Sequence, residues 1–334
     1  MNETYTQKPS FTKFRYALRP AKNIERKMLC EALGNLSCIA SIRSYRYVGF
    51  GSVEFVDFSL FHQRLGIRDM LSIERAEEFE DRFEFNKPYS CIKIEWGMSH
   101  AVLPTLDWSK RTILWLDYDR PLNRDILGDI ELLVSSTRSG SVIIVTVNAE
   151  PQKTFESDNI HETRLKALVS RVGADHLPLI LGDGGTRRPL RGADLAKWGL
   201  AKVSRDIIHN VIQKTLNDRN GALTARAQLQ YKQLFNFRYA DTAKMLTVGG
   251  ILLNSRDQSK LPRGVFEQLE FVSCDDKPYY IESALLTLRE LRHLDRCLTP
   301  TGYVQQPPNW LPKRECHKYR RIYRYFPTFA EVEA

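Results

Sequence analysis

The stretch that decides the fold reads Tyr45-Arg-Tyr-Val-Gly-Phe-Gly-Ser52 and continues, after a helical pattern, to Met70-Leu-Ser-Ile-Glu74. This order predicts a strand, a glycine turn, a helix, and a second strand that ends in a carboxylate. Two glycines in such a turn let the backbone approach a ligand, and an acid roughly 20 residues later holds the ribose hydroxyls of a bound nucleoside. The stretch therefore predicts a nucleoside pocket.

The rest of the first half alternates between short apolar runs and helical patterns. The apolar runs are rich in Val, Ile and Leu, which is typical of buried parallel strands. Strands that alternate with helices predict right-handed βαβ units, and hence a doubly wound α/β sheet with helices on both faces. The predicted strands are Arg46–Phe50, Asp69–Ile73, Ser90–Glu95, Thr112–Leu116 and Ser141–Val147, and two later ones at Tyr231–Tyr239 and Lys244–Asn254 form an antiparallel pair.

This reading divides the chain into five segments, which we expect to be successive parts of one α/β protein. Residues 1–44 are a helical lead-in, and residues 45–150 are the Rossmann-like core that binds a cofactor. An inserted loop and helical region occupies residues 151–227. The antiparallel pair that completes the sheet takes residues 228–256, and a helical extension with a basic, aromatic tail takes residues 257–334.

Composition limits the class of protein. The chain has 334 residues, of which 43% are hydrophobic, and this is enough to build a sizeable core. No apolar run approaches the roughly 18 residues that a membrane-spanning helix needs. The six cysteines are scattered without a Cys-x-x-Cys pair, so reduced thiols in a cytoplasmic protein are expected.

The formal net charge of +9 is concentrated in part at the C-terminus. The segment from Lys313 to Tyr325 interleaves basic residues with tyrosines, a pattern that suits a phosphate backbone and stacked bases. The other interpretation is a helix face that packs its tyrosines on the parent domain. The candidate nucleic-acid contacts are Lys313, Arg314, Lys318, Arg320, Arg321 and Arg324.

The order of motifs resembles class I S-adenosylmethionine-dependent methyltransferases over roughly residues 45–150, with weaker support from 231–254. The stretch Arg46-Tyr-Val-Gly-Phe-Gly-Ser-Val-Glu-Phe-Val-Asp-Phe58 is in particular similar to one shared by O-methyltransferase-like proteins of prokaryotes. The resemblance implies S-adenosylmethionine as cofactor. It also implies binding roles for Gly49, Gly51, Ser52, Glu74, Trp96 and Ser99, and places Asp117 and Asp119 beside the transferred methyl group as catalytic candidates.

Two positions depart from the pattern of that family. Many of these enzymes carry an acid two positions before the first glycine, where it binds the amino group of the cofactor, but this chain has Tyr47. A catechol-type magnesium site would need acids after the fourth and fifth strands. Here only Asp117 and Asn148 are in place, and unless Glu150 substitutes they make a poor magnesium site. We therefore expect no resident divalent metal.

The sequence leaves two functions open. One is methyl transfer from S-adenosylmethionine to a nucleic acid or to a small hydroxylated molecule. The other is a catalytically degenerate fold that serves as a scaffold or nucleotide-sensing subunit, with protein partners, in a larger complex of the kind used in phage defence. An aromatic side chain, Phe50 or Trp96, that filled the predicted pocket would favour the scaffold. Asp57, inside the first helix, is expected to be an exposed or capping group.

Overall fold

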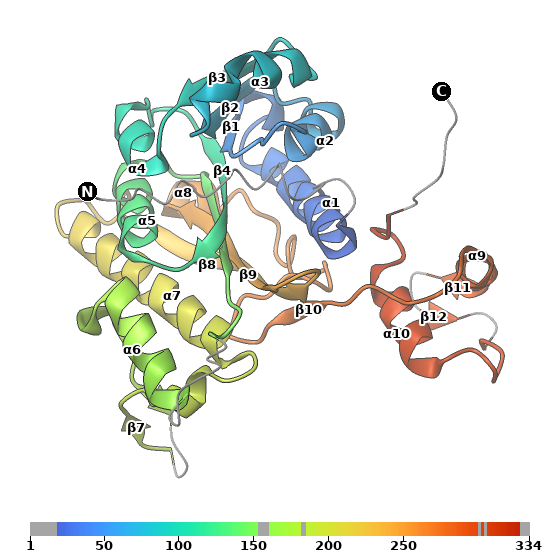
Figure 1. Cartoon of the computed structure of the whole chain (residues 1–334). Helices are drawn as coiled ribbons and strands as arrows, with labels where there is room; N and C mark the ends of the chain where they lie inside the picture. Colours follow the sequence, from blue (N-terminus) through green and yellow to red (C-terminus); the bar gives the residue numbers. More distant parts are fainter. Residues whose placement is uncertain (1–18, 153–159, 182–184, 300–301, 304–305, 328–334) are drawn as a thin grey trace.

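The computed structural model describes residues 19–152, 160–181, 185–299, 302–303 and 306–327. Its centre is an eight-stranded sheet with the order β10-β8-β9-β5-β4-β1-β2-β3 (Figure 1). The strands are β1 (Arg46–Gly49), β2 (Asp69–Glu74), β3 (Ile92–Trp96), β4 (Thr112–Pro121), β5 (Val142–Asn148), β8 (Gln230–Ala240), β9 (Lys244–Leu253) and β10 (Tyr279–Ile281).

The pairing directions confirm the predicted sheet. The first five strands are parallel to one another, whereas β9 runs antiparallel to both β5 and β8. The late antiparallel pair therefore completes the sheet, as expected. The last edge strand, β10, has no counterpart in the prediction, because its three residues lie in a polar segment without a strand-length apolar run.

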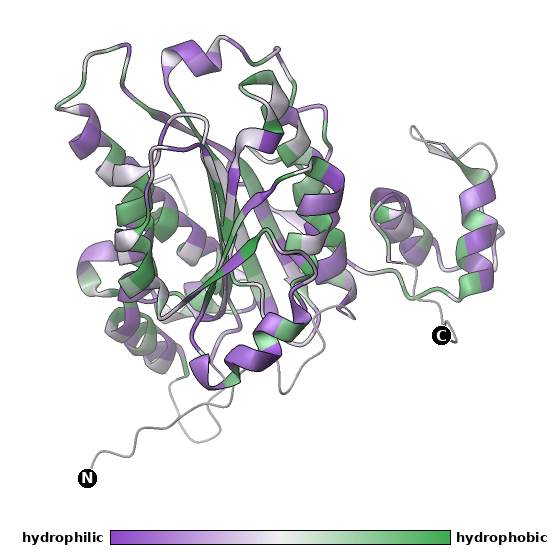
Figure 2. Ribbon diagram, turned by 90° about the horizontal axis from the view of Figure 1, so that it is seen from above, coloured by the Kyte–Doolittle hydropathy of each residue, from purple (hydrophilic) through white to green (hydrophobic). Residues whose placement is uncertain are grey.

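Helices cover both faces of the sheet (Figures 1 and 2). The α-helices of the described residues are α1 (Pro20–Gly34), α2 (Val56–Leu65), α3 (Glu80–Asn86), α4 (Ser99–Val102), α5 (Arg124–Ser136), α6 (Ile160–Val172), α7 (Gly199–Asn220), α8 (Ser255–Gln258), α9 (Leu288–Cys297) and α10 (Lys313–Ile322), of which α9 and α10 belong to a C-terminal unit. Side chains alternate across a strand. Thus Tyr47 joins the core beneath α1 and α2, and its neighbour Val48 joins the core beneath α5, α6 and α7.

Helix α1 is fixed on the sheet by a distant carboxylate. The two Oδ atoms of Asp241, in the turn between β8 and β9, accept hydrogen bonds from the backbone N–H groups of Ala21 and Lys22 at 3.0 and 3.2 Å. These donors belong to the first turn of the helix and have no partner within it. Pro20 opens the helix, where its missing N–H costs nothing. Asp241 therefore both caps α1 and sets the position of its side chains over the sheet.

The C-terminal residues form a small unit beside the sheet (Figures 1 and 2), and the end of α10 contacts β10, where the Tyr279 hydroxyl donates to the Arg321 carbonyl at 3.3 Å. It contains α9, α10 and the hairpin of β11 (Leu298–Thr299) with β12 (Gly302–Tyr303). Its own apolar cluster includes Leu294, Leu311 and Tyr319. A second hairpin, β6 (Ile180–Leu181) with β7 (Arg187–Arg188), lies in the region between β5 and β8. None of the helices in the described ranges is long and apolar enough to cross a membrane.

Candidate functional site

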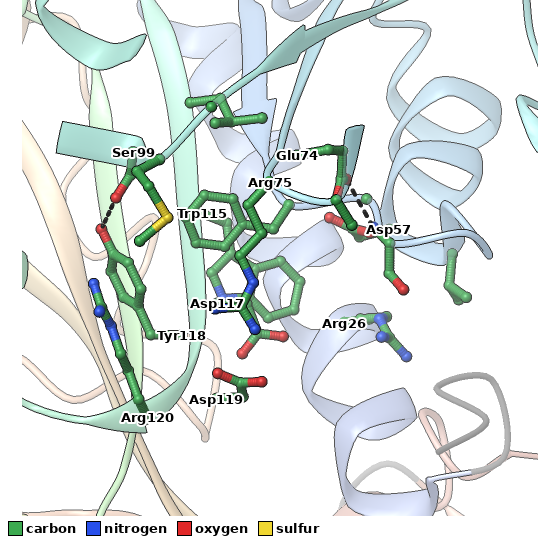
Figure 3. A pocket seen from close by; sticks show the side chains of 18 residues that line it. Arg26, Asp57, Glu74, Arg75, Ser99, Trp115, Asp117, Tyr118, Asp119 and Arg120 are labelled. Atoms are coloured by element: carbon green, nitrogen blue, oxygen red, sulfur yellow. Dashed lines mark hydrogen bonds between the residues drawn. The ribbon is translucent and has the colours of Figure 1, made fainter. Parts of the chain in front are cut away.

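A cavity of ≈ 160 Å³ lies at the carboxyl ends of β1, β2 and β4. This is the edge at which doubly wound sheets bind their ligands. Figure 3 shows acidic, basic and aromatic side chains converging on it. The lining residues are Arg26, Phe50, Gly51, Ser52, Val56, Asp57, Ile73, Glu74, Arg75, Ala76, Gly97, Met98, Ser99, Trp115, Asp117, Tyr118, Asp119 and Arg120. Six of the predicted site residues are among them: Gly51, Ser52, Glu74, Ser99, Asp117 and Asp119.

The turn after β1 admits no side chain at Gly51. A Cβ atom at this position would lie 2.5 Å from Cδ1 of Phe55 and 2.8 Å from Oγ of Ser72, both closer than real Cβ contacts. The Gly51 N–H donates to the same Oγ at 2.8 Å. Gly49 is also crowded, because its Cβ would lie 2.7 Å from the hydroxyl of Tyr47. Gly49 does not line the cavity, so its requirement is packing beneath the turn.

Glu74, at the end of β2, is a buried carboxylate that faces the cavity (Figure 3). Its Oε1 accepts hydrogen bonds from the Ser52 N–H at 3.0 Å and from the Ser72 Oγ at 2.6 Å. Burial raises the pKa of Glu74 from 4.5 to about 7. Withdrawal from water disfavours the ionised form, so a ligand that donates hydrogen bonds to the carboxylate would offset this cost.

Asp57 is the main site residue that sequence reasoning misplaced. The prediction of an exposed or capping group is wrong, because Asp57 is 7% exposed and lines the cavity from the first turn of α2. The Tyr47 hydroxyl donates a hydrogen bond to its Oδ2. Burial raises the pKa of Asp57, and the guanidinium of Arg26, another lining residue, opposes that rise. Tyr47 thus positions an acid near the place where the family pattern has its own.

Asp117 is held by a buried cation. The ammonium of Lys22, from α1, lies 2.8 Å from Oδ2 of Asp117 and 2.8 Å from Oε2 of Glu25. It also lies 4.4 Å from the ring centroid of Trp115, whose ring borders the cavity. Lys22 and Glu25 are 1% and 0% exposed. Because burial is costly for an unpaired charge, each of these groups depends on the others.

Asp119 and Arg120 follow on the same strand, closer to solvent. Asp119 is exposed at the cavity mouth, and within the described residues no cation lies at ion-pair distance from it. Arg120 pairs loosely with Asp125, at 3.7 Å. Of the two acids predicted beside the reacting group, Asp119 is therefore the one open to an incoming molecule.

On the opposite wall, Ser99 belongs to a buried three-residue network. Ser99 Oγ and the Tyr118 hydroxyl each donate to Oδ2 of Asp129 at 2.5 Å. Burial raises the pKa of both Asp129 and Tyr118. Asp129 comes from α5, so no local motif around Ser99 could reveal it. The network fixes the side chains of Ser99 and Tyr118 at the cavity wall.

Besides Gly49, two predicted site residues lie outside the cavity lining. The ring of Trp96 packs edge-on against Phe83, 5.4 Å between centroids, and does not line the cavity. Asn148 Oδ1 accepts from the Glu150 N–H at 2.8 Å, and Asn148 is also outside the lining. The structure therefore does not bring Asn148 and Asp117 together as metal ligands. No group of three or more His, Cys, Asp or Glu side chains in the described part of the chain is arranged so that it could hold a metal ion.

Most of the named basic residues of the C-terminal segment form ion pairs with acidic side chains, and most of these acids belong to other parts of the chain. Lys318 contacts Glu315 at 2.8 Å, Arg324 contacts Glu31 at 2.8 Å, and Arg321 contacts Glu270 at 3.6 Å. Arg314 lies 3.7 Å from Glu282, and the tyrosines at positions 319 and 325 are buried. The second interpretation, a face that packs its tyrosines on the protein, describes these contacts. Nucleic-acid contact stays a prediction.

The buried tyrosines decide how the nucleic-acid prediction is best tested. Deleting the segment would break a packed cluster, whereas Lys313→Gln with Arg314→Gln removes two exposed charges and leaves the tyrosines in place. If the segment contacts phosphates, this double variant binds a short RNA more weakly and with a smaller salt dependence than the unmodified protein. Identical binding by the two proteins across a salt series would assign the segment a structural role.

The sequence and the fold can be compared with those of known proteins. A family model described as "Putative O-methyltransferase" matches residues 14–334. No curated protein matches the sequence. Similar solved structures include an O-methyltransferase family protein from Burkholderia thailandensis, with 7% identity, coverage of 69% of this chain and 56% of that protein, and a TM-score of 0.34. The chain thus spans little more than half the length of that protein.

Two further solved structures are similar to this chain. One is the O-methyltransferase TomG from Streptomyces achromogenes in complex with S-adenosylmethionine, with 12% identity, coverage of 67% and 79%, and a TM-score of 0.33. The other is Trm1 from Pyrococcus horikoshii with S-adenosylmethionine, with 10% identity, coverage of 71% and 58%, and a TM-score of 0.39.

Proposed function

The chain belongs to the O-methyltransferase family whose model matches it, and we propose that it binds S-adenosylmethionine and transfers the methyl group to an acceptor oxygen. The observation that carries the proposal is Glu74, a buried acid that ends β2 and faces a cavity at the edge of the sheet where ligands bind. Among the described residues no cation pairs with Glu74, and such a buried carboxylate is costly unless it serves a ligand. Two ribose hydroxyls are donors of the right kind.

We assign the amino-acid end of the cofactor to Asp57 and Arg26. This end carries one ammonium and one carboxylate, and the two side chains bring one charge of each sign to the same side of the cavity. Asp57 would bind the ammonium, the role that the family pattern gives to an acid at the position of Tyr47. Arg26 would bind the carboxylate. In this arrangement the contact to the ammonium comes from Asp57, which the Tyr47 hydroxyl orients, and not from an acid at position 47 itself.

The adenine end falls to the loop after β3. Gly97, Met98 and Ser99 line that wall, whereas Trp96 points into the core. The thioether of Met98 offers a polarisable surface for a ring. Ser99 is held by Asp129 and marks the polar boundary of this wall. The proposed adenine contact is thus Met98 in place of Trp96.

At the reacting end, the cofactor supplies an electrophilic methyl group on a sulfonium. Carboxylates and aromatic faces both stabilise such a cation. Asp117, Trp115 and Phe50 border this part of the cavity. Asp119, exposed at the mouth, is placed to orient an acceptor hydroxyl and to take its proton as the oxygen–carbon bond forms. Methyl transfer then depends mainly on alignment of the two reactants.

The alternative is a scaffold that has lost catalysis. A cavity filled by Phe50 or Trp96 would have favoured it. Instead, Phe50 stands at the wall, in edge contact with Tyr118 at 5.2 Å, and Trp96 is outside. The open cavity favours ligand binding. Incubation with labelled S-adenosylmethionine and mixed hydroxylated acceptors or RNA tests turnover. Cofactor binding without methyl transfer to any acceptor class would support the scaffold.

Cofactor affinity should depend on pH through Glu74. Its pKa is about 7 in the free protein, and the ionised carboxylate is the form that accepts two hydroxyl hydrogen bonds. Affinity therefore falls as the pH falls through 7, and we expect binding to be about tenfold weaker at pH 6 than at pH 8. Calorimetric titration at both pH values measures the difference. In Glu74→Gln this pH dependence should disappear, and its persistence would place the titrating group elsewhere.

A further inference from the structure

A second cavity, of ≈ 650 Å³, lies at the opposite edge of the sheet, near the amino ends of β4 and β5 and the end of β9. Its volume is within the range of about 300–1,000 Å³ that is typical of small-molecule sites. The lining brings together five basic side chains and one carboxylate, Asp257, with three serines and one asparagine. The basic residues are Arg111, Arg138, Arg219, Arg256 and Lys260.

The one carboxylate of the lining is already used. The carboxylate of Asp257 lies 3.1 Å from Nη2 of Arg111 and 2.7 Å from Nζ of Lys260, and the Ser139 Oγ donates a hydrogen bond to it at 2.8 Å. These contacts fix the polar side chains on this side of the cavity. Asp257 is 3% exposed, and a carboxylate that is buried to this extent needs such partners to stay charged. Asp257 therefore anchors two of the five cations and leaves the other three.

The other three arginines have no carboxylate partner among the described residues. Arg219 donates only to the carbonyls of Val134 and Thr137, at 2.6 and 2.9 Å, at the end of α5. Burial lowers the pKa of Arg219, so its charge is held at a cost. Arg138 donates to one carbonyl, that of Ser109, at 3.3 Å. An anion in the cavity would neutralise the excess positive charge.

The surroundings indicate what kind of anion fits. The basic groups come from separate segments: the turn before β4, the turn after α5, the end of α7, and α8 with the residues after it. A chain of phosphates can contact more of these separate groups at once than a single phosphate can. Guanidinium groups bind phosphate oxygens through paired hydrogen bonds, and serine hydroxyls add neutral donors.

We propose that this cavity binds a small anion that carries two or more phosphate groups, at a site separate from the methyl-transfer cavity. Inorganic tripolyphosphate and a nucleoside triphosphate share this chemistry. Binding here does not require cofactor binding, because the two cavities share no lining residue.

The test compares two double variants that change the net charge equally. Arg138→Gln with Arg256→Gln removes two arginines from the cavity but spares Arg219, which also caps α5. Arg289→Gln with Arg292→Gln removes two exposed arginines from α9, outside the cavity. Tripolyphosphate, ATP, adenosine and a short RNA are titrated into each protein by calorimetry at low salt, and thermal unfolding reports whether each variant is folded.

We expect tripolyphosphate or ATP to bind the unmodified protein and the cavity variant to lose at least about tenfold in that affinity, whereas any binding of adenosine, which carries no phosphate, should be the same in both proteins. The α9 variant should bind as the unmodified protein does. Binding of both probes assigns the site to the phosphate chain, and binding of ATP alone to a nucleotide. The proposal is overturned if neither probe binds, if both variants weaken equally, or if only a short RNA binds. Cofactor binding is measured separately, so the two proposals fail independently.

Discussion

Glu74→Ala should weaken S-adenosylmethionine binding by at least about 100-fold. Hydrogen bonds to a charged group contribute about 1.5–3 kcal/mol each, and the ribose would offer two of them. The loss should also be selective, because Glu74 makes its other hydrogen bonds to the Ser52 N–H in the turn after β1 and to the Ser72 hydroxyl of its own strand. Calorimetric titration at pH 8 measures it. Affinity within threefold of the unmodified protein would remove Glu74 from the site.

Glu74→Gln provides the matched control, because it keeps the shape and removes the charge. Burial raises the pKa of Glu74 from 4.5 to about 7. The favourable contribution of this group to folding is therefore present below pH 4.5 and is lost as the pH rises through 7. We expect Glu74→Gln to be more stable than the unmodified protein at pH 8, by at most about 3 kcal/mol, with a smaller gain at pH 5. A lower melting temperature at pH 8 would contradict this.

Lys22→Met should lower the free energy of unfolding by about 3–5 kcal/mol. The ammonium of Lys22 is the shared partner of Glu25 and Asp117, at 2.8 Å from each, and it also donates to the Tyr239 hydroxyl at 3.2 Å. Methionine fills a similar volume but leaves Glu25 buried without its cation. Urea unfolding, followed by circular dichroism, gives the change in free energy.

An exposed ion pair serves as the control for Lys22. Lys166 lies 2.6 Å from Glu162 one helical turn away, and both side chains are more than half exposed. Lys166→Met should therefore change the stability by less than about 1 kcal/mol. Adding Glu25→Met to Lys22→Met should recover part of the loss, because both members of the buried pair are then apolar. A loss below 1 kcal/mol in Lys22→Met would show that the buried network contributes little.

The sheet was predictable because its information is local. Each buried strand is a short run of β-branched and aliphatic residues between turns, and the glycine turn with Glu74 lies within 30 residues of sequence. These features predicted the order of elements and placed six site residues at one cavity. The antiparallel pair was readable for the same reason, from two strong runs around a short polar turn.

The contacts that complete the site are not local, and sequence reasoning missed them. Asp57 is held at the cavity by the Tyr47 hydroxyl, which donates a hydrogen bond to its Oδ2 from another element, ten residues away in the sequence. The ion pair between Lys22 and Asp117 depends on the position of α1. Asp241, 220 residues from Ala21, caps that helix and fixes it on the sheet. One signal was available: a tyrosine at a position where the family carries an acid predicts that another acid lies nearby.

Trp96 illustrates the limit of reading side chains along a strand. A tryptophan next to a candidate cofactor loop suggested an adenine contact. The register of β2 with β3 pairs Trp96 with Glu74 on one face of the sheet, but there the indole packs against Phe83 of α3 and does not line the cavity. The face toward the ligand is left to Met98, one of the few exposed large apolar side chains of the protein.

The central claim is that the cavity beside Glu74 binds S-adenosylmethionine. Titration of the unmodified protein with this cofactor and with its demethylated product at pH 8 tests that claim most directly. We predict that each ligand binds saturably with one molecule per chain, and that the two ligands compete with each other. The absence of binding at millimolar concentrations of either ligand, in protein shown to be folded, would contradict it.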